Sequence, residues 1–118
     1  MKRVVWHNAA KKDFLDTVNY IKDSFGTLVA SECLSDIQKT INLLSQFPYL
    51  GKAEPDLNYK GFRIYALHSK MNRILYVVNE NDVLIIAIWN NRMNFENIHK
   101  ILTLYNTDCY NFLQYSLI

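Results

Sequence analysis

The chain has 118 residues, of which 50% are hydrophobic, 14% aromatic and 20% charged, as expected for one ordered globular domain. Only 3 glycines and 2 prolines are present, which excludes collagen-like and low-complexity chains. The longest apolar run, residues 83–89, is far shorter than the roughly 20 residues that a membrane-spanning helix needs. We therefore expect a soluble protein with no membrane partner.

Signals for export, disulfides and metal binding are weak. Few apolar residues follow Lys2 and Arg3 before His7, too few for the core of a signal peptide. The two cysteines, Cys33 and Cys109, form no CxxC or Cys/His cluster, so the sequence predicts neither a disulfide framework nor a metal site. We expect a cytoplasmic protein with no metal and no other cofactor.

Positive charge is concentrated in the middle of the chain. The net charge is +2, which is weak for a protein that must hold many phosphates of a nucleic acid. Residues 51–78 carry 5 Lys or Arg against 2 Asp or Glu, whereas residues 79–118 carry 2 against 4. Any phosphate-binding site is therefore expected in the middle segment.

The N-terminal part is expected to form a strand and two helices. Residues 3–6 are β-prone, and Asn8 stands where the N-cap of a helix belongs. Gly26 separates two apolar stripes at helical spacing, namely Phe14, Val18, Ile21 and Phe25, then Leu34, Ile37, Ile41 and Leu44. The second stripe ends at Phe47, before Pro48. Two helices joined by a short turn predict an antiparallel αα-hairpin.

The remaining elements are expected to be strands and a C-terminal helix. Residues 48–61 are polar and contain Pro and Gly, which predicts a loop. Three β-prone segments, residues 62–67, 72–78 and 83–89, predict an antiparallel meander. With the N-terminal strand and the αα-hairpin packed on one face of this small antiparallel sheet, the fold class is α+β. Helical spacing beyond residue 94 predicts a C-terminal helix and tail, so residues 1–94 form the main domain and residues 95–118 an extension of it.

The order of these segments resembles the RelE/ParE superfamily of bacterial toxins from type II toxin–antitoxin pairs. The resemblance covers about residues 3–94 and depends on an ordered set rather than on one motif. The matching pieces are Val4-Val5-Trp6 with Ala9 and Ala10, Phe47-Pro48-Tyr49-Leu50-Gly51, Pro55, Gly61-Phe62-Arg63, the run from Asn72 to Val78, and the run from Val83 to Trp89 with Arg92 behind it.

The resemblance implies a small toxin that arrests growth and is held silent by a cognate antitoxin protein encoded beside it, as in plasmid stabilisation. RelE-like members enter the ribosome and cleave mRNA, with the ribose 2′-OH as the nucleophile, so the chain is a candidate endoribonuclease. ParE-like members bind DNA gyrase without comparable chemistry. A third alternative is a degenerate member that binds only its antitoxin. The fold itself does not choose among these modes.

For the ribonuclease mode, the resemblance assigns catalytic roles to two arginines. Arg73 would hold the scissile phosphate, and Arg92 would stabilise the charge that develops in the transition state. His68 is the candidate proton carrier, because imidazole titrates near neutral pH. Further phosphate-binding candidates in the same segment are Arg63, Lys60 and Lys70. The structural alternatives are an Arg73 whose stem packs on aromatic rings and a His68 that is simply solvated in a turn.

The register of the sheet decides whether Arg63 and Arg73 share a face. Pairing Leu67 with Asn72 and Val78 with Val83 places Arg73 on the face of Leu84, Ile86 and Ile88, and Arg63 on the opposite face with Tyr65, Tyr76 and Trp89. A slip of one residue would bring both arginines to the same side.

Two departures from the ribonuclease pattern favour a ParE-like binder. The chain is nearly neutral, and the stretch after Arg92 holds no nearby Tyr or His in the position that the resemblance leads one to expect. Cys33 is predicted to be buried or half-buried as a small apolar residue. The helical carboxylates are predicted to face water, namely Asp13, Asp16, Asp23 and Asp36.

Overall fold

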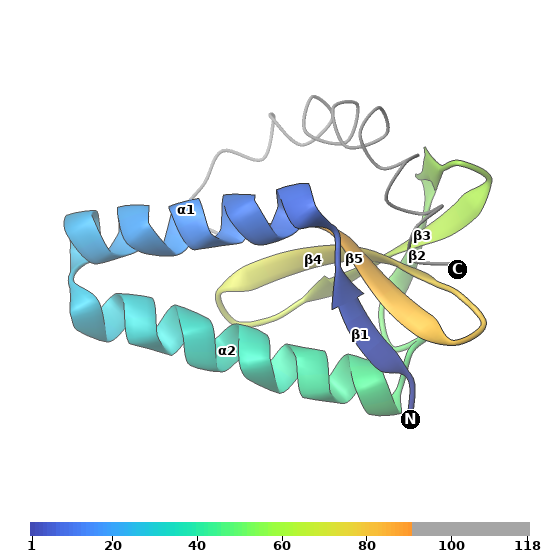
Figure 1. Ribbon diagram of the computed structural model, residues 1–118, viewed down its shortest axis with the longest axis horizontal. Helices are drawn as coiled ribbons and strands as arrows, with labels where there is room; N and C mark the ends of the chain where they lie inside the picture. The colour runs from blue at the N-terminus through green and yellow to red at the C-terminus, as the bar shows by residue number, and fades with distance from the viewer. Residues whose placement is uncertain (91–118) are drawn as a thin grey trace.

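The structure is a computed structural model that describes residues 1–90, in which two helices pack against one sheet of five strands (Figure 1). In chain order the elements are β1 (Arg3–Trp6), α1 (Asn8–Phe25), α2 (Thr27–Gln46), β2 (Lys52–Tyr59), β3 (Phe62–His68), β4 (Asn72–Val78) and β5 (Asp82–Asn90). This arrangement confirms the predicted α+β fold and the helical hairpin.

The sheet has the strand order β1-β5-β4-β3-β2 and is mixed, not purely antiparallel. β1 pairs with β5 in parallel, with Val4 opposite Val83, while the other three pairs are antiparallel. The parallel pair is possible because the chain between β1 and β5 is long enough to form a crossover that includes the helical hairpin. Our expectation of an antiparallel sheet is therefore correct for the meander and wrong for the N-terminal strand.

Strand β2 lies in the segment that the sequence predicted to be a loop. It forms one edge of the sheet, and its pairing with β3 shifts register between Ala53 and Asn58. An edge strand with such an irregularity tolerates Pro55, whose missing N–H would interrupt a central ladder. Lys60 and Gly61, with φ of 51° and 85°, close the hairpin between β2 and β3, as a two-residue turn of the primed type requires. The Pro and Gly residues of this segment therefore belong to an edge hairpin rather than to an unstructured loop.

The helices begin and pack slightly differently from the prediction. His7, not Asn8, is the N-cap of α1, because its Nδ1 accepts a hydrogen bond of 3.0 Å from the backbone N–H of Ala9. Gly26 adopts φ of 97° in the turn between the helices. The predicted stripe members Phe25 and Leu34 are exposed, whereas the buried positions of the two helices are Ala10, Phe14, Thr17, Val18, Ile21, Ala30, Cys33, Ile37, Thr40 and Leu44.

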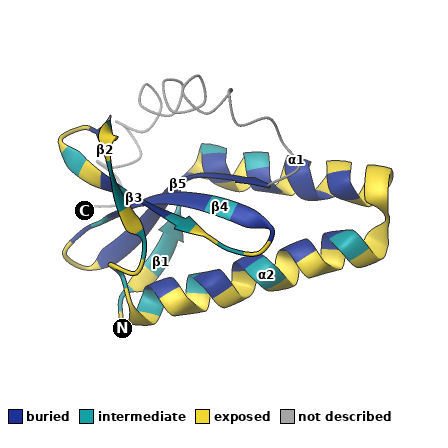
Figure 2. Cartoon of the chain, turned by 180° about the vertical axis from the view of Figure 1, so that it is seen from behind, coloured by how far each residue is buried: buried dark blue, intermediate teal, exposed yellow. Residues whose placement is uncertain are grey.

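The sheet has buried residues on both faces. The helices share one core with alternate residues of the central strands, among them Ile74, Tyr76, Ile85 and Ile88. Residues of opposite orientation form a second core on the other face, which includes Ile64, Ala66, Leu75, Val77, Leu84, Ile86, Ala87 and Trp89. Figure 2 shows β4 and β5 almost entirely buried, whereas the closed end of the helical hairpin, which extends beyond the sheet, is exposed. This pattern explains why the last strand is apolar at nearly every position.

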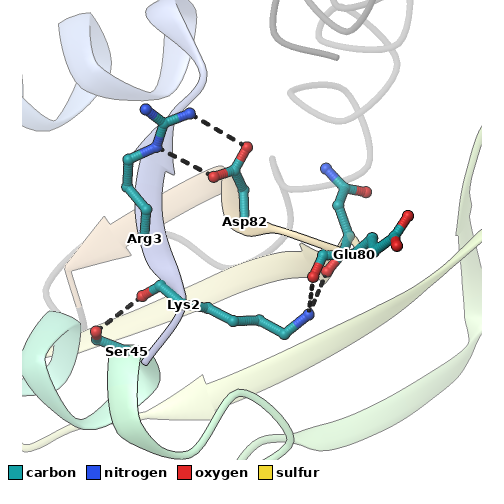
Figure 3. A network of polar contacts seen from close by, with 6 residues as sticks. Lys2, Arg3, Ser45, Glu80 and Asp82 are labelled. Carbon is teal, nitrogen blue, oxygen red and sulfur yellow. Dashed lines mark hydrogen bonds and ion pairs between the residues drawn. The ribbon is translucent and has the colours of Figure 1, made fainter.

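The N-terminal strand is fixed by polar contacts at its N-terminal end (Figure 3). Lys2 Nζ donates to the carbonyl oxygens of Asn79 and Glu80 in the turn between β4 and β5, and the Lys2 backbone exchanges hydrogen bonds with Ser45 at the end of α2. Arg3 Nε lies 3.1 Å from Asp82 Oδ1. These contacts tie β1 to the hairpin turn and to α2.

The predictions for Arg92, Cys109 and the extension at residues 95–118 lie outside the described residues. Within residues 1–90, neither helix is long and apolar enough to cross a membrane.

Candidate functional site

Three of the central strands place one functional side chain each in a single row. His68 of β3 is opposite Arg73 of β4, and Arg73 is opposite Trp89 of β5. Residues that are directly opposite in a sheet project to the same face, with Cβ atoms about 5 Å apart. Trp89 belongs to the second core, to which the helices contribute Ala9 and Ala10 at the start of α1. The row therefore lies on the face of the sheet that the helical hairpin does not cover.

A bulge in the sheet determines which aromatic residue stands beside Arg73. Val78 pairs with Val83 as predicted, but the register shifts between Leu75 and Tyr76, so that Leu75 is opposite Ala87 and Tyr76 is opposite Ile85. The extra residue on β5 reverses the orientation of the residues after it. Our prediction that Arg73 shares a face with Leu84 and Ile86 is correct, whereas Ile88 faces the helices and Trp89 takes the place beside Arg73.

Two side chains contact the Arg73 guanidinium, namely Glu54 of β2 and Trp89 of β5. Its Nη2 lies 3.3 Å from Oε1 of Glu54, and its guanidinium carbon lies 5.2 Å from the centre of the Trp89 ring. The side chains of Arg73 and Glu54 are only 17% and 27% exposed, so their attraction is screened less than that of a surface pair. The cation is therefore partly buried, paired with a carboxylate and stacked on an indole.

Glu54 is a site residue that sequence reasoning missed. It lies in β2, just after the pair that joins Ala53 to Tyr65. Had the sequence predicted a strand at residues 52–59 instead of a loop, Glu54 would have been found. Alternation along that strand places Glu54 on the face opposite Tyr65, which is the face of Arg73. The negative charge of this residue changes what the predicted cationic site can bind.

His68 is exposed at the end of β3, and the charges of Arg73 and Glu54 shift its pKa in opposite directions. Partial burial lowers the pKa of His68 below 6.5, the Arg73 cation lowers the pKa further, and the Glu54 carboxylate opposes these effects. At neutral pH the imidazole is therefore mainly uncharged. It adds hydrogen-bonding capacity to the row rather than a second fixed positive charge.

The other predicted phosphate-binding residues do not join this row. Arg63 is exposed and projects to the face opposite Arg73, as predicted. The pairing behind that prediction is wrong, because Leu67 lies opposite Ile74 and not Asn72, but a shift of two residues leaves the faces unchanged.

Lys60 lies in the turn between β2 and β3, and Lys70 lies in the turn between β3 and β4, where it lines a cavity of about 240 Å³ beside α2. The cationic middle of the sequence is thus divided among several surfaces. Arg92 lies outside the part of the chain that the structure describes.

A buried polar network shapes the turn that separates His68 from Arg73. Asp36 of α2 accepts hydrogen bonds from Ser69 Oγ, from the Met71 backbone N–H at 3.3 Å and from Asn72 Nδ2 at 2.9 Å. Asn72 also accepts a weak contact of 3.5 Å from Cys33 Sγ. Our prediction that Asp36 faces water is therefore wrong, whereas the predicted burial of Cys33 is confirmed. The carboxylate holds the turn against the helix because the turn offers several N–H and O–H donors that need an acceptor.

Comparison with known proteins places the chain in a family. Residues 4–95 match the family model described as "ParE toxin of type II toxin-antitoxin system, parDE". The chain is 33% identical over 94 residues to Toxin ParE3 of Caulobacter vibrioides, a match that covers 80% of this chain and 91% of that protein. The chain belongs to the ParE toxin family. The resemblance to the RelE/ParE superfamily is thereby confirmed.

One solved structure supports this fold for the ParE family member. The chromosomal ParDE toxin–antitoxin system from P. aeruginosa superposes with a TM-score of 0.62 at 17% identity, over 76% of this chain and 96% of the other. The E. coli toxin RelE, a mutant in the free state, superposes with a TM-score of 0.43 at 14% identity, over 77% and 84% of the two chains. The first match supports the ParE-like arrangement of helices and sheet.

The chemical content of the site is one guanidinium, one carboxylate, one imidazole and one indole. Among residues 1–90, no group of three or more His, Cys, Asp or Glu side chains is placed to hold a metal ion. The ParE family member therefore presents, on the described part of its sheet, a charge-balanced row rather than a strongly cationic surface.

Proposed function

We propose that this ParE family toxin arrests growth by binding DNA gyrase, the target that the superfamily resemblance implies for ParE-like members. The observation that carries the proposal is the ion pair between Arg73 and Glu54, in a chain whose family match is to ParE toxins. RNA cleavage needs a cation that is available to the scissile phosphate, and in this site the guanidinium is already paired. A net charge of +2 is also small for a protein that works among ribosomal RNA.

The closed end of the helical hairpin is the proposed contact surface for gyrase. It extends beyond the sheet in both views of the fold (Figures 1 and 2). Two large apolar side chains lie near it, with Leu28 73% exposed and Tyr20 59% exposed. Projecting apolar side chains are typical of surfaces that bind another protein.

A supercoiling assay with purified gyrase tests this function. We expect inhibition at micromolar toxin, and an increase of at least tenfold in the half-inhibitory concentration for Leu28→Asp. Asp is favourable in the first turn of a helix, so this substitution removes the apolar contact without weakening α2. Gln38→Asp adds the same charge to an exposed position farther along α2 and should behave like the wild type. The proposal fails if gyrase is not inhibited, and the assigned surface fails if both variants inhibit equally.

We also propose that a cognate antitoxin is the physiological partner. The P. aeruginosa structure with the same fold is part of a ParDE toxin–antitoxin system. The direct test is to express the chain alone and together with the protein encoded beside it. Growth arrest that the neighbouring protein relieves supports the proposal, whereas normal growth on expression alone favours a degenerate member that only binds antitoxin.

Cleavage of mRNA is the second candidate function, and one feature of the site favours it. Glu54, His68 and Arg73 share one face and supply a base, a proton carrier and a cation, the groups needed to activate a ribose 2′-OH and stabilise the phosphate. Mapping mRNA ends in a translating extract tests this function. New cuts that disappear with Arg73→Ala support it, and unchanged mRNA in the presence of active toxin excludes it.

A further inference from the structure

We propose that the second core of the sheet is an internal docking surface for the chain's own C-terminal segment, residues 95–118. The segment would form a third layer, on the face that carries His68, Arg73 and Trp89. The family model matches residues 4–95, so this segment begins where the family pattern ends. The proposal concerns how the toxin covers its own sheet, and it stands or falls independently of the target.

The second core needs a covering layer because its strand residues lie side by side in one sheet. Leu75 and Val77 of β4 and Leu84 of β5 have at most 1% of their surface exposed. Side chains of a strand stand roughly perpendicular to the sheet, so their outer ends are shielded from water by a layer packed on them. Among residues 1–90, the helices contribute Ala9 and Ala10 to this core, close to the edge strand β1, whereas the core extends across the sheet to β2.

The chain leaves the sheet beside this face, with enough length to cover it. β5 ends at Asn90, directly after Trp89 of the second core. As a helix, residues 95–105 would span about 16 Å, and the seven residues of β4 span about 23 Å. A helix of this length, with residues 106–118 beside it, matches the dimensions of the face.

The sequence of the segment has the pattern of a layer with one apolar side. Between residues 95 and 105, apolar residues recur at helical spacing, namely Phe95, Ile98, Ile101, Leu102 and Tyr105. The same spacing puts Glu96, Lys100 and Thr103 on the opposite side. Residues 109–118 contain no Asp, Glu, Lys or Arg, so they can be buried without the cost of removing a charge from water.

A layer in this place also accounts for the low exposure of the row. Trp89 is 6% exposed, and the Arg73 side chain is 17% exposed. A partner that is to contact the Arg73 guanidinium would first have to displace the segment. The row is therefore an internal surface of the toxin, which leaves the helical hairpin as the open contact surface.

The first test introduces a charge into the apolar side of the segment in the full chain. Ile101→Asp should release the segment and raise the fluorescence of the dye ANS, which binds exposed apolar surface, by about threefold or more. Thr103→Asp adds the same charge to the polar side and should behave like the wild type. Equal ANS binding by the two variants overturns the proposal.

Double-mutant cycles identify the surface on which the segment packs. Ile101→Ala is combined with Val77→Ala or Leu84→Ala of the second core, and with Ile37→Ala of the core that the helices share with the sheet. In urea unfolding, we expect at least one of the first two pairs to deviate from additivity by about threefold or more in the unfolding constant, and the pair with Ile37→Ala to be additive within about twofold. The alanine cycles decide the placement even where Ile101→Asp unfolds the protein.

The proposal is overturned if Ile101→Ala is additive with both second-core variants, or if it couples to Ile37→Ala instead. Sedimentation distinguishes a layer within one chain from an exchange between two copies. We expect a monomer whose unfolding does not depend on protein concentration. A dimer that Ile101→Asp dissociates would show that the segment covers a second copy, and would overturn the internal placement.

Discussion

The backbone N–H of Gly51 donates a hydrogen bond of 2.8 Å to the hydroxyl oxygen of Tyr76, a residue at the centre of the sheet. Tyr76 stacks on Tyr65, which meets the exposed ring of Tyr49 edge-on at 5.6 Å. The segment Phe-Pro-Tyr-Leu-Gly that follows α2 is therefore docked on the sheet through its glycine and its tyrosine. The glycine is needed for close approach, since an added Cβ would lie 2.7 Å from both Tyr76 Oη and the carbonyl oxygen of Ala66.

Gly51→Ala should destabilise the fold by about 1–3 kcal/mol, as expected when a methyl group is forced into a filled space. The neighbouring carbonyl belongs to the β3 backbone and has little freedom to move away. Urea unfolding followed by circular dichroism measures the change. Lys52→Ala, at the exposed adjacent position, should stay within about 0.5 kcal/mol of the wild type. Equal effects of the two substitutions would show that the close approach is not needed.

Tyr76→Phe should cost about 0.5–1.5 kcal/mol at neutral pH, because the Gly51 N–H loses its acceptor. Burial raises the pKa of Tyr76 above 10.0, with the Gly51 hydrogen bond acting in the opposite direction. The folded state thus favours the protonated phenol, and the resulting stability is present below pH 10 and lost as pH rises through the higher folded pKa. The difference between wild type and Tyr76→Phe should therefore shrink above pH 10 in urea unfolding at a series of pH values. A stability difference between wild type and Tyr76→Phe that grows above pH 10 would contradict the raised pKa of Tyr76.

The sequence was sufficient to predict the elements that follow simple periodicity. Both helices, β1, β4 and the relative faces of Arg63 and Arg73 agree with the structure, because apolar spacing and strand alternation determine them. It was not sufficient for β2, where Pro55 and nearby turn residues are typical of both loops and irregular edge strands. Missing this strand also meant missing Glu54.

The remaining differences come from tertiary context. The bulge in β5 places Trp89 instead of Ile88 beside Arg73. Residues 83–89 are all apolar, so no alternation of polar and apolar residues shows where the extra residue lies. Asp36 looks like any exposed helical carboxylate until the turn between β3 and β4 supplies donors from more than 30 positions away in the chain. Long-range partners of this kind are set by the fold and not by the residues on either side.

Asp36→Ala should lower the free energy of unfolding by about 2–4 kcal/mol, because Ser69, Met71 and Asn72 all lose the acceptor that Asp36 provides. Asp16→Ala is the matched control, since it removes an exposed carboxylate from a helix interior and carries the same gain in helix propensity. It should be neutral or slightly stabilising. Urea unfolding of both variants measures the difference, and an Asp36→Ala variant as stable as Asp16→Ala would mean that the network contributes little.

The start of α1 offers the clearest contrast between the sequence prediction and the structure. His7 Nδ1 caps the helix by accepting from the Ala9 N–H, and the His7 ring is almost fully buried, whereas Asn8 is exposed and already helical. His7→Ala should cost about 1–3 kcal/mol through the lost cap and the space left behind. Asn8→Ala should change stability by less than about 0.5 kcal/mol. His7→Asn restores a capping acceptor in a smaller side chain, so it should recover part of the loss in thermal or urea unfolding. A larger loss of stability for Asn8→Ala than for His7→Ala would show that Asn8 is the N-cap, as the sequence predicted.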